Sequence, residues 1–201
     1  MSLIRNIYSR PMQSTEARAV YIGRGHRDFP SNELKPFSMI MSLMNSGCYE
    51  CCGFYDKADD SLRAYAFMMA DKETNMLLLD YFAVCEEVRG KGYGSVALEL
   101  LKADYMNYDG MLFEVEDDDA AETEAEMQLR RRRISFYERN GVVMTEQRSR
   151  AFGVDFRLMV MNLGKTSEEN DIGYLIASMY QKMLPCLLYT SPSPRDRTRS
   201  R

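Results

Sequence analysis

Three glycines alternate with basic and aromatic residues at positions 89–94, which read Arg-Gly-Lys-Gly-Tyr-Gly. The segment follows an apolar run at 76–84 and leads into residues 95–101, where we expect a helix to begin. Glycine lets a ligand approach the backbone closely, and the free N–H groups of a helix N-terminus attract anions. Arg89 and Lys91 add positive charge. The sequence therefore predicts a phosphate-binding loop between a strand and a helix.

The spacing of these glycines excludes two common phosphate-binding motifs. A Walker A loop requires glycine at the position of Cys85 and serine or threonine at the position of Gly92. The dinucleotide fingerprint requires a third glycine where Ser95 stands. The loop instead matches the pattern Arg/Gln-x-x-Gly-x-Gly/Ala, which begins at Arg89.

A second motif, Ile-Ser-Phe-Tyr-Glu-Arg-Asn-Gly-Val, occupies residues 134–142 at the predicted end of a helix. It is similar to the signature Phe-Tyr-x-x-x-Gly-Phe. On these two motifs and the predicted order of elements, residues 2–163 resemble the GNAT superfamily of acyl-CoA-dependent N-acetyltransferases. The resemblance implies an α/β fold, in which helices flank a mixed, mostly antiparallel sheet.

The resemblance implies that acetyl-CoA is the co-substrate and that its acetyl group passes directly to a primary amine in a ternary complex, without a metal. The diphosphate would lie on the glycine loop, and the pantetheine arm would run beside the strand at 76–84. The implied cofactor-binding residues are Phe82, Ala83, Val84, Arg89, Gly90, Lys91, Gly92, Tyr93 and Gly94.

Two catalytic residues follow from the same resemblance. Tyr137 matches the tyrosine that protonates the departing thiolate, and a phenol with a pKa of ~10 is protonated at neutral pH. Glu114 matches the glutamate base of ribosomal-protein N-terminal acetyltransferases, and alternation along residues 112–116 puts it on the same face as Glu116. Asp80 or a water molecule is the alternative base.

Two features depart from the family pattern. Arg130 and Arg133 stand where family members often have asparagine and alanine. The link from Glu114 to Tyr137 is longer than usual and holds the acidic stretch 116–126, which is either a solvated helix face or a lip that attracts a cationic acceptor. The acceptor stays open between a cationic small amine and a peptide or protein N-terminus. The alternative function is a non-catalytic acyl-CoA-binding regulatory module.

Composition narrows the class of protein. The chain has 201 residues, 45% of them hydrophobic, and a formal net charge of −4, which favours a globular domain and argues against nucleic acid as a partner. The sequence has no apolar run of membrane-spanning length and no secretory signal, so we expect a cytoplasmic protein, and a homodimer is left open. Cys48 and Cys51 have metal-ligand spacing, but with one histidine available we expect reduced, partly buried thiols.

The elements that must position these residues follow from hydrophobic periodicity and turn signals. We expect residues 11–31 to be irregular. Predicted strands cover Leu3–Tyr8, 49–55, 63–69, 76–84, 110–116, 142–148 and 152–162, with the last two joined by a turn at Ser149 and Arg150. Predicted helices cover 32–45, 95–106, much of 120–139, and 168–183 with Ser167 as its cap.

The C-terminal part lies beyond the predicted domain at 2–163. Residues 167–184 form a predicted helical extension, whose apolar stripe would pack either on the sheet or against a second copy. Residues 185–201 resemble a translated sequencing-adapter read, and we expect a non-native, disordered tail. Without the four arginines and one aspartate of this tail, the net charge changes from −4 to −7.

Overall fold

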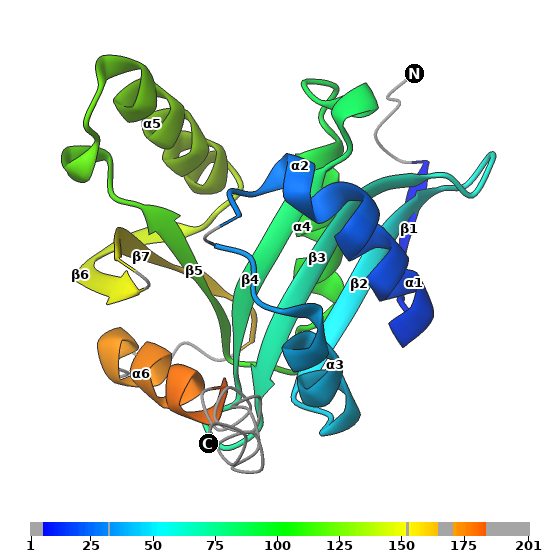
Figure 1. Cartoon of the computed structure of the whole chain (residues 1–201), viewed down its shortest axis with the longest axis horizontal. Helices are drawn as coiled ribbons and strands as arrows, with labels where there is room; N and C mark the ends of the chain where they lie inside the picture. The colour runs from blue at the N-terminus through cyan, green and yellow to red at the C-terminus, as the bar shows by residue number, and fades with distance from the viewer. Residues whose placement is uncertain (1–5, 32, 152, 165–170, 184–201) are drawn as a thin grey trace, which may run out of the picture.

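A seven-stranded mixed sheet forms the centre of the molecule (Figure 1). The computed structural model describes residues 6–31, 33–151, 153–164 and 171–183. All neighbouring strands are antiparallel except β4 and β5, which confirms the expected α/β fold with a mostly antiparallel sheet. In spatial order the strands are β1 (Ile7–Pro11), β2 (Tyr49–Asp56), β3 (Leu62–Asp71), β4 (Met76–Val84), β5 (Gly110–Glu116), β7 (Val154–Asn162) and β6 (Val143–Ala151).

Helices cover both faces of this sheet, and each face has its own apolar core. One core receives side chains from α4 (Tyr93–Asp104) and α5 (Glu124–Arg139). The other core is covered by α1 (Ser14–Val20), the π-helical turn η2 (Tyr21–Gly25), α3 (Phe37–Asn45) and α6 (Ile172–Met183). The remaining helical turns are α2 (His26–Asp28), η3 (Glu86–Val88) and η4 (Asp118–Ala120). No helix among the described residues is both long and apolar enough to cross a membrane.

The central strand β4 has two irregularities that open the sheet. Its parallel ladder with β5 ends at the pair Leu79 and Phe113, after four residue pairs. In its ladder with β3, Tyr81 pairs with Phe67 and Leu79 pairs with Met68, so Asp80 is the extra residue of a β-bulge. Beyond Leu79, β4 and β5 therefore diverge, and a gap between neighbouring strands lies in the middle of the fold.

The glycine-rich loop forms the turn that the sequence predicted. Gly92 caps α4 with a φ of +86°, which is a left-handed conformation that favours glycine. Gly94 lies so close to α5 that a Cβ atom there would be 3.0 Å from Cζ of Phe136 and 3.2 Å from Cγ2 of Val84. The two motifs of the sequence are thus packed against each other.

The N-terminal third differs from the prediction. Residues 14–28, expected to be irregular, are helical, because Ala17 and Tyr21 bury their side chains in the core despite the neighbouring glycines. Strand β1 lies at Ile7–Pro11 rather than at residues 3–8, since this segment pairs with β2. Helix α3 starts at Phe37 rather than at residue 32, because Pro36 disfavours helical backbone at the residue before it.

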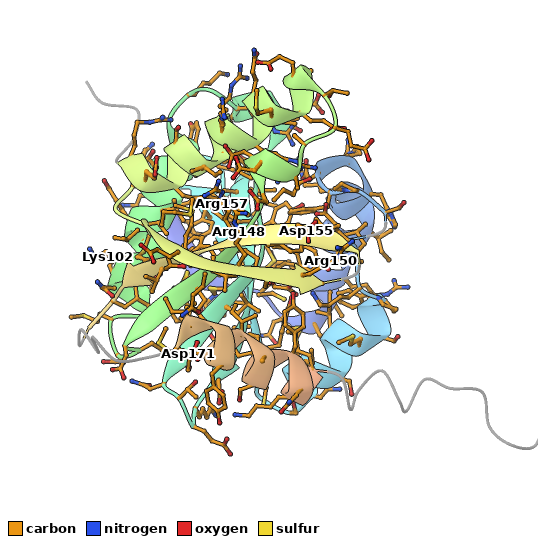
Figure 2. The ribbon with its side chains drawn as sticks, turned by 90° about the vertical axis from the view of Figure 1, so that its left-hand side faces the viewer. Lys102, Arg148, Arg150, Asp155, Arg157 and Asp171 are labelled. Atoms are coloured by element: carbon orange, nitrogen blue, oxygen red, sulfur yellow. The ribbon has the colours of Figure 1, made fainter. Side chains whose placement is uncertain are left out.

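Strands β6 and β7 and helix α6 lie on the side of the molecule that faces the viewer in Figure 2. The turn expected at Ser149 and Arg150 is wrong, because β6 continues to Ala151 and Arg150 pairs with Asp155. The stripe on α6 packs on the sheet, where Leu175, Ile176, Met179 and Met183 are buried. The predicted cap Ser167, residues 168–170 and the tail 185–201 lie outside the described residues.

Candidate active site

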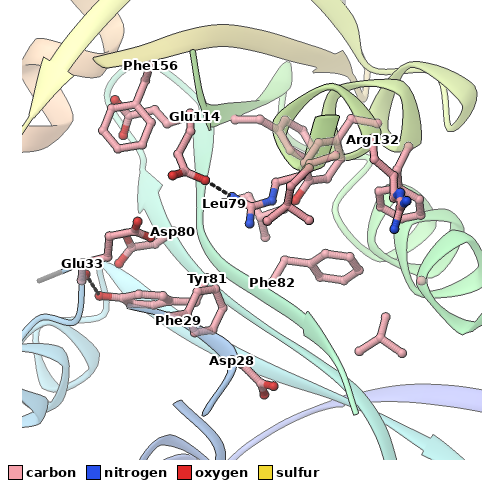
Figure 3. A pocket seen from close by; sticks show the side chains of 18 of the residues that line it. Asp28, Phe29, Glu33, Leu79, Asp80, Tyr81, Phe82, Glu114, Arg132 and Phe156 are labelled. Carbon is pink, nitrogen blue, oxygen red and sulfur yellow. Dashed lines mark hydrogen bonds and ion pairs between the residues drawn. The ribbon is translucent and has the colours of Figure 1, made fainter. Parts of the chain in front are cut away.

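A cavity of about 660 Å³ lies where β4 and β5 diverge (Figure 3). Its walls come from β4, the glycine loop, β5, α5, the segment before α3, the β6–β7 hairpin and α6. Most of the residues predicted from the sequence line it together, namely Phe82, Val84, Arg89, Gly90, Gly92, Tyr93, Gly94, Glu114 and Tyr137. The alternative base Asp80 lines it as well.

Two predicted residues do not line the cavity. The side chain of Ala83 is buried in the core on the α3 side of the sheet. Lys91 is exposed, and its Nζ donates a hydrogen bond to the carbonyl of Glu87, 3.1 Å away. The role expected for Ala83 is that its backbone pairs with the pantetheine arm beside β4, and this stays a prediction.

The loop end of the cavity is rich in hydrogen-bond donors and positive charge. The first turn of α4 starts at Gly92 without a side-chain cap, so its backbone N–H groups have no intrahelical acceptors. Arg89 donates from Nε to the Val84 carbonyl and pairs with the carboxylate of Asp28. Arg132 and Arg139 of α5 line the same cavity. The sequence prediction missed Arg132 because the run at 130–133 equally fits a solvated helix face, and it gave Arg139, which lies within the second motif, no role.

Tyr137 packs against aromatic side chains of β5 and α5. Its ring meets Phe113 edge to face with centroids 5.0 Å apart, and Phe136 stacks on Phe82 at 6.4 Å. Burial raises the pKa of Tyr137 to about 12, an effect that Arg133 partly offsets. The hydroxyl donates no hydrogen bond within the described part of the chain. It is therefore a protonated group that is available as a proton donor.

Glu114 lies on the other side of β5 from Phe113, as the alternation predicted. Its Oε1 accepts a hydrogen bond from Ser149 Oγ at 2.7 Å, and its Oε2 accepts one from Tyr180 Oη at 2.5 Å. Burial raises the pKa of Glu114, although both hydrogen bonds act in the opposite direction. A carboxylate with a raised pKa is a stronger base than an exposed one.

Asp80 is engaged on both oxygens. Oδ1 pairs with the Lys35 ammonium at 2.5 Å, and Oδ2 accepts a hydrogen bond from the Tyr49 hydroxyl. This ion pair is almost completely buried, since the two side chains are 8% and 10% exposed. Asp80 is therefore held by an ammonium and a hydroxyl, whereas the hydrogen-bond partners of Glu114 are two neutral hydroxyls.

A further carboxylate, Glu33, was not predicted. It precedes α3, lines the cavity, and has a pKa raised by burial. Figure 3 shows Glu33, Asp80 and Glu114 on one side of the cavity and Arg132 on the other. The cavity therefore has an acidic end and a basic end.

The acidic stretch 116–126 contributes little to this cavity. Glu116 lines it but is paired with Arg133 at 2.7 Å and with Arg130 at 3.5 Å. Glu122, Glu124 and Glu126 are exposed and are not among the lining residues, so they do not form a lip there.

Two sets of residues have side chains that could bind a metal, namely the aspartates at 117–119 and the cysteines near β2. The carboxylates of Asp117, Asp118 and Asp119 lie within 4.8 Å of one another. They are paired with arginines, including Arg157, which lies 3.1 Å from Asp117 and 2.9 Å from Asp118. Of the cysteines with metal-ligand spacing, Cys48 is half-buried and Cys51 is buried, and among the described residues neither belongs to a group of three possible metal ligands.

Similar folds occur among solved acetyltransferase structures. A structure described as a GNAT-family acetyltransferase from Bacteroides thetaiotaomicron has a TM-score of 0.64 at 20% identity, over 92% of this chain and 99% of that chain. The ribosomal-protein-S18-alanine N-acetyltransferase of Escherichia coli has a TM-score of 0.59 at 16% identity, over 82% and 98%. A dodecameric spermidine N-acetyltransferase of Vibrio cholerae has a TM-score of 0.57 at 11% identity, over 79% of this chain and 94% of that chain. By sequence, no family model and no curated protein matches the chain.

Proposed function

We propose that this chain, which has the GNAT fold, is an acetyl-CoA-dependent N-acetyltransferase that acts on a primary amine. One observation carries the proposal. A single cavity joins the glycine-rich loop at 89–94 to a buried carboxylate of raised pKa, Glu114, and a protonated phenol, Tyr137. These are the groups that a direct transfer from a thioester to an amine requires.

In this proposal the basic end of the cavity binds the donor. The diphosphate accepts hydrogen bonds from the N–H groups around Gly92 and Gly94, and Arg132 and Arg139 offset its charge. The pantetheine arm runs along β4 beyond Leu79, where the strand has no ladder pairs with β5. Its amides add to β4 like a short extra strand.

The chemistry then needs only groups of this chain. Glu114 takes a proton from the acceptor ammonium, directly or through a water molecule, and the amine nitrogen attacks the thioester carbonyl carbon. A backbone N–H of β4 stabilises the oxyanion of the tetrahedral intermediate. The C–S bond breaks as the intermediate collapses, and Tyr137 donates its proton to the departing thiolate. The nitrogen of the new amide gives its remaining extra proton to the Tyr137 phenolate, directly or through water, and Glu114 releases its proton to solvent, so both groups are restored without a metal.

The acceptor binds at the acidic end in this proposal. Glu33 and Glu114 are carboxylates without a cationic partner among the described residues, which suits an ammonium group. The proteins of similar fold include a spermidine N-acetyltransferase and a ribosomal-protein-S18-alanine N-acetyltransferase, so this proposal keeps both a cationic small amine and a peptide or protein N-terminus as acceptors. A cytoplasmic location, a homodimer and a domain boundary near residue 163 stay predictions.

The test is an acetylation assay with acetyl-CoA and an amine panel, in which release of CoA is measured. The panel contains polyamines, other small primary amines and peptides with different N-terminal residues. Turnover with at least one acceptor, confirmed by the mass of its acetylated product, supports the proposal. A protein that binds CoA but is inactive across the panel is instead a non-catalytic acyl-CoA-binding module.

A further inference from the structure

Helix α6 brings a side chain into the candidate active site. Tyr180 lines the cavity, and its hydroxyl donates a hydrogen bond to Oε2 of Glu114 at 2.5 Å. The helix follows the region 2–163 that carries the family motifs, so neither motif predicts this contact. One oxygen of the proposed base is therefore held by an element outside that region.

Contacts at both ends hold α6 in place. Asp171 caps the first turn, and the Gly173 N–H donates to Oε1 of Gln147 on β6. Near the other end, Lys182 pairs with Asp71 at 2.6 Å and with Glu73 at 2.8 Å. Because the apolar stripe between these ends is buried, Tyr180 has a fixed position relative to the sheet.

The groups that face Glu114 give Tyr180 a specific effect on it. Ser149 of β6 and Tyr180 are neutral donors to the two oxygens, while Asp80 of β4 raises the pKa of Glu114 and Lys35 lowers it. The hydrogen bond from Tyr180 favours the carboxylate form and so opposes the effect of burial. Burial and the nearby Glu114 raise the pKa of Tyr180 itself, so its hydroxyl keeps the proton that it donates.

We propose that Tyr180 is a positioning residue, which orients the Glu114 carboxylate toward the acceptor amine and stabilises its ionised form. The role in catalysis rests on the proposed function, whereas the effect on the Glu114 carboxyl does not. Helix α6 is then a required part of the acceptor site, rather than an appendage to the transferase fold.

The test compares Tyr180→Phe, which removes only the hydroxyl, with Tyr174→Phe on the same helix, whose tyrosine is 68% exposed and lies outside the cavity. The ¹³C signal of the Glu114 carboxyl is assigned by its loss in Glu114→Gln, and its titration is followed by NMR. We expect the Glu114 midpoint to rise in Tyr180→Phe and to stay unchanged in Tyr174→Phe. In the acetylation assay, kcat/KM of Tyr180→Phe should fall about tenfold on the acidic side of the pH profile, with the KM for acetyl-CoA unchanged.

The outcomes separate the two proposals. An unchanged Glu114 midpoint in folded Tyr180→Phe overturns the positioning role, whatever the activity of the wild-type protein. A raised midpoint in a protein that acetylates no amine leaves the contact established and rejects the proposed function. If Tyr180→Phe unfolds, 3-fluorotyrosine at position 180 serves instead, because a more acidic hydroxyl should lower the Glu114 midpoint while the shape of the ring is kept.

Discussion

The Lys35 ammonium and the Asp80 carboxylate form an ion pair of 2.5 Å in which both side chains are at least nine-tenths buried. Asp80 is also the extra residue of the bulge in β4, so the pair lies where the strand turns away from β5. This pairing gives Asp80 a structural role at the edge of the cavity.

Asp80→Asn should therefore destabilise the fold, because it leaves a buried ammonium without a counter-ion. We expect the free energy of unfolding to fall by about 3–5 kcal/mol, measured by urea denaturation. The matched control is Asp59→Asn, which breaks the ion pair between the exposed Asp59 and Arg63 and should cost much less. Equal losses in the two variants would contradict the structural role of Asp80.

Gly94→Ala should impair cofactor binding, because the added methyl group meets Phe136 and Val84. We expect CoA to bind about tenfold more weakly by calorimetry, and a stability loss of about 1–3 kcal/mol from overpacking. Gly23→Ala is the control, since a Cβ at Gly23 has open space and the backbone is helical. A Gly94→Ala variant with wild-type affinity for CoA would show that the loop is not the binding site.

Tyr137→Phe should lower kcat roughly 100-fold, since general acid catalysis typically contributes at least that factor. The affinity for CoA should be unchanged, because the hydroxyl makes no hydrogen bond that holds the described part of the fold together. The control is Tyr108→Phe, at a tyrosine that packs on Tyr105 outside the cavity. If Tyr137→Phe retains full turnover, another group protonates the thiolate.

The raised pKa of Glu114 predicts a pH dependence of defined sign. In the proposed mechanism the carboxylate is the active form, so kcat/KM should increase with pH through a midpoint above the ordinary glutamate range. The pH profile of Glu114→Gln should lack this rising step in kcat/KM. The profile of Glu122→Gln, at an exposed residue outside the cavity, should keep the step. A step that persists in Glu114→Gln would belong to the acceptor amine.

The same shift has a consequence for stability. The folded protein holds the Glu114 proton more tightly than the unfolded chain, so the contribution of this group is fully present below the unfolded pKa. It is lost as pH rises through the folded pKa. The difference in unfolding free energy between wild type and Glu114→Gln should therefore change in that window, which denaturation at several pH values measures.

The sequence predicted the parts of the site that depend on local pattern. The loop at 89–94 and the pair Phe136 and Tyr137 have characteristic spacing, and alternation within β5 correctly put Glu114 on the face opposite Phe113. The structure adds that both motifs line one cavity with Glu114. These features depend on turn chemistry and strand periodicity, which short stretches of sequence express.

The residues that were missed depend on contacts between distant segments. Tyr180 meets Glu114 across 66 positions, and Ser149, expected in a turn, lies within β6 and donates to the same carboxylate. Neither hydroxyl belongs to a recognisable motif. The helical stretch 14–28 was missed for a related reason, since burial of Ala17 and Tyr21 outweighs the low helix propensity of the glycines beside them.

The gap between β4 and β5 also affects how the purified protein should behave. Beyond the pair Leu79 and Phe113, β4 and β5 have no ladder pairs with each other, although both lie within the sheet. Unpaired strand edges normally occur only at the outside of a sheet. Unpaired edges recruit other chains, and a bound ligand both covers them and stabilises the folded state by mass action. We therefore expect CoA, bound as proposed, to slow aggregation and extend the shelf life of the purified protein, which light scattering during storage with and without CoA measures.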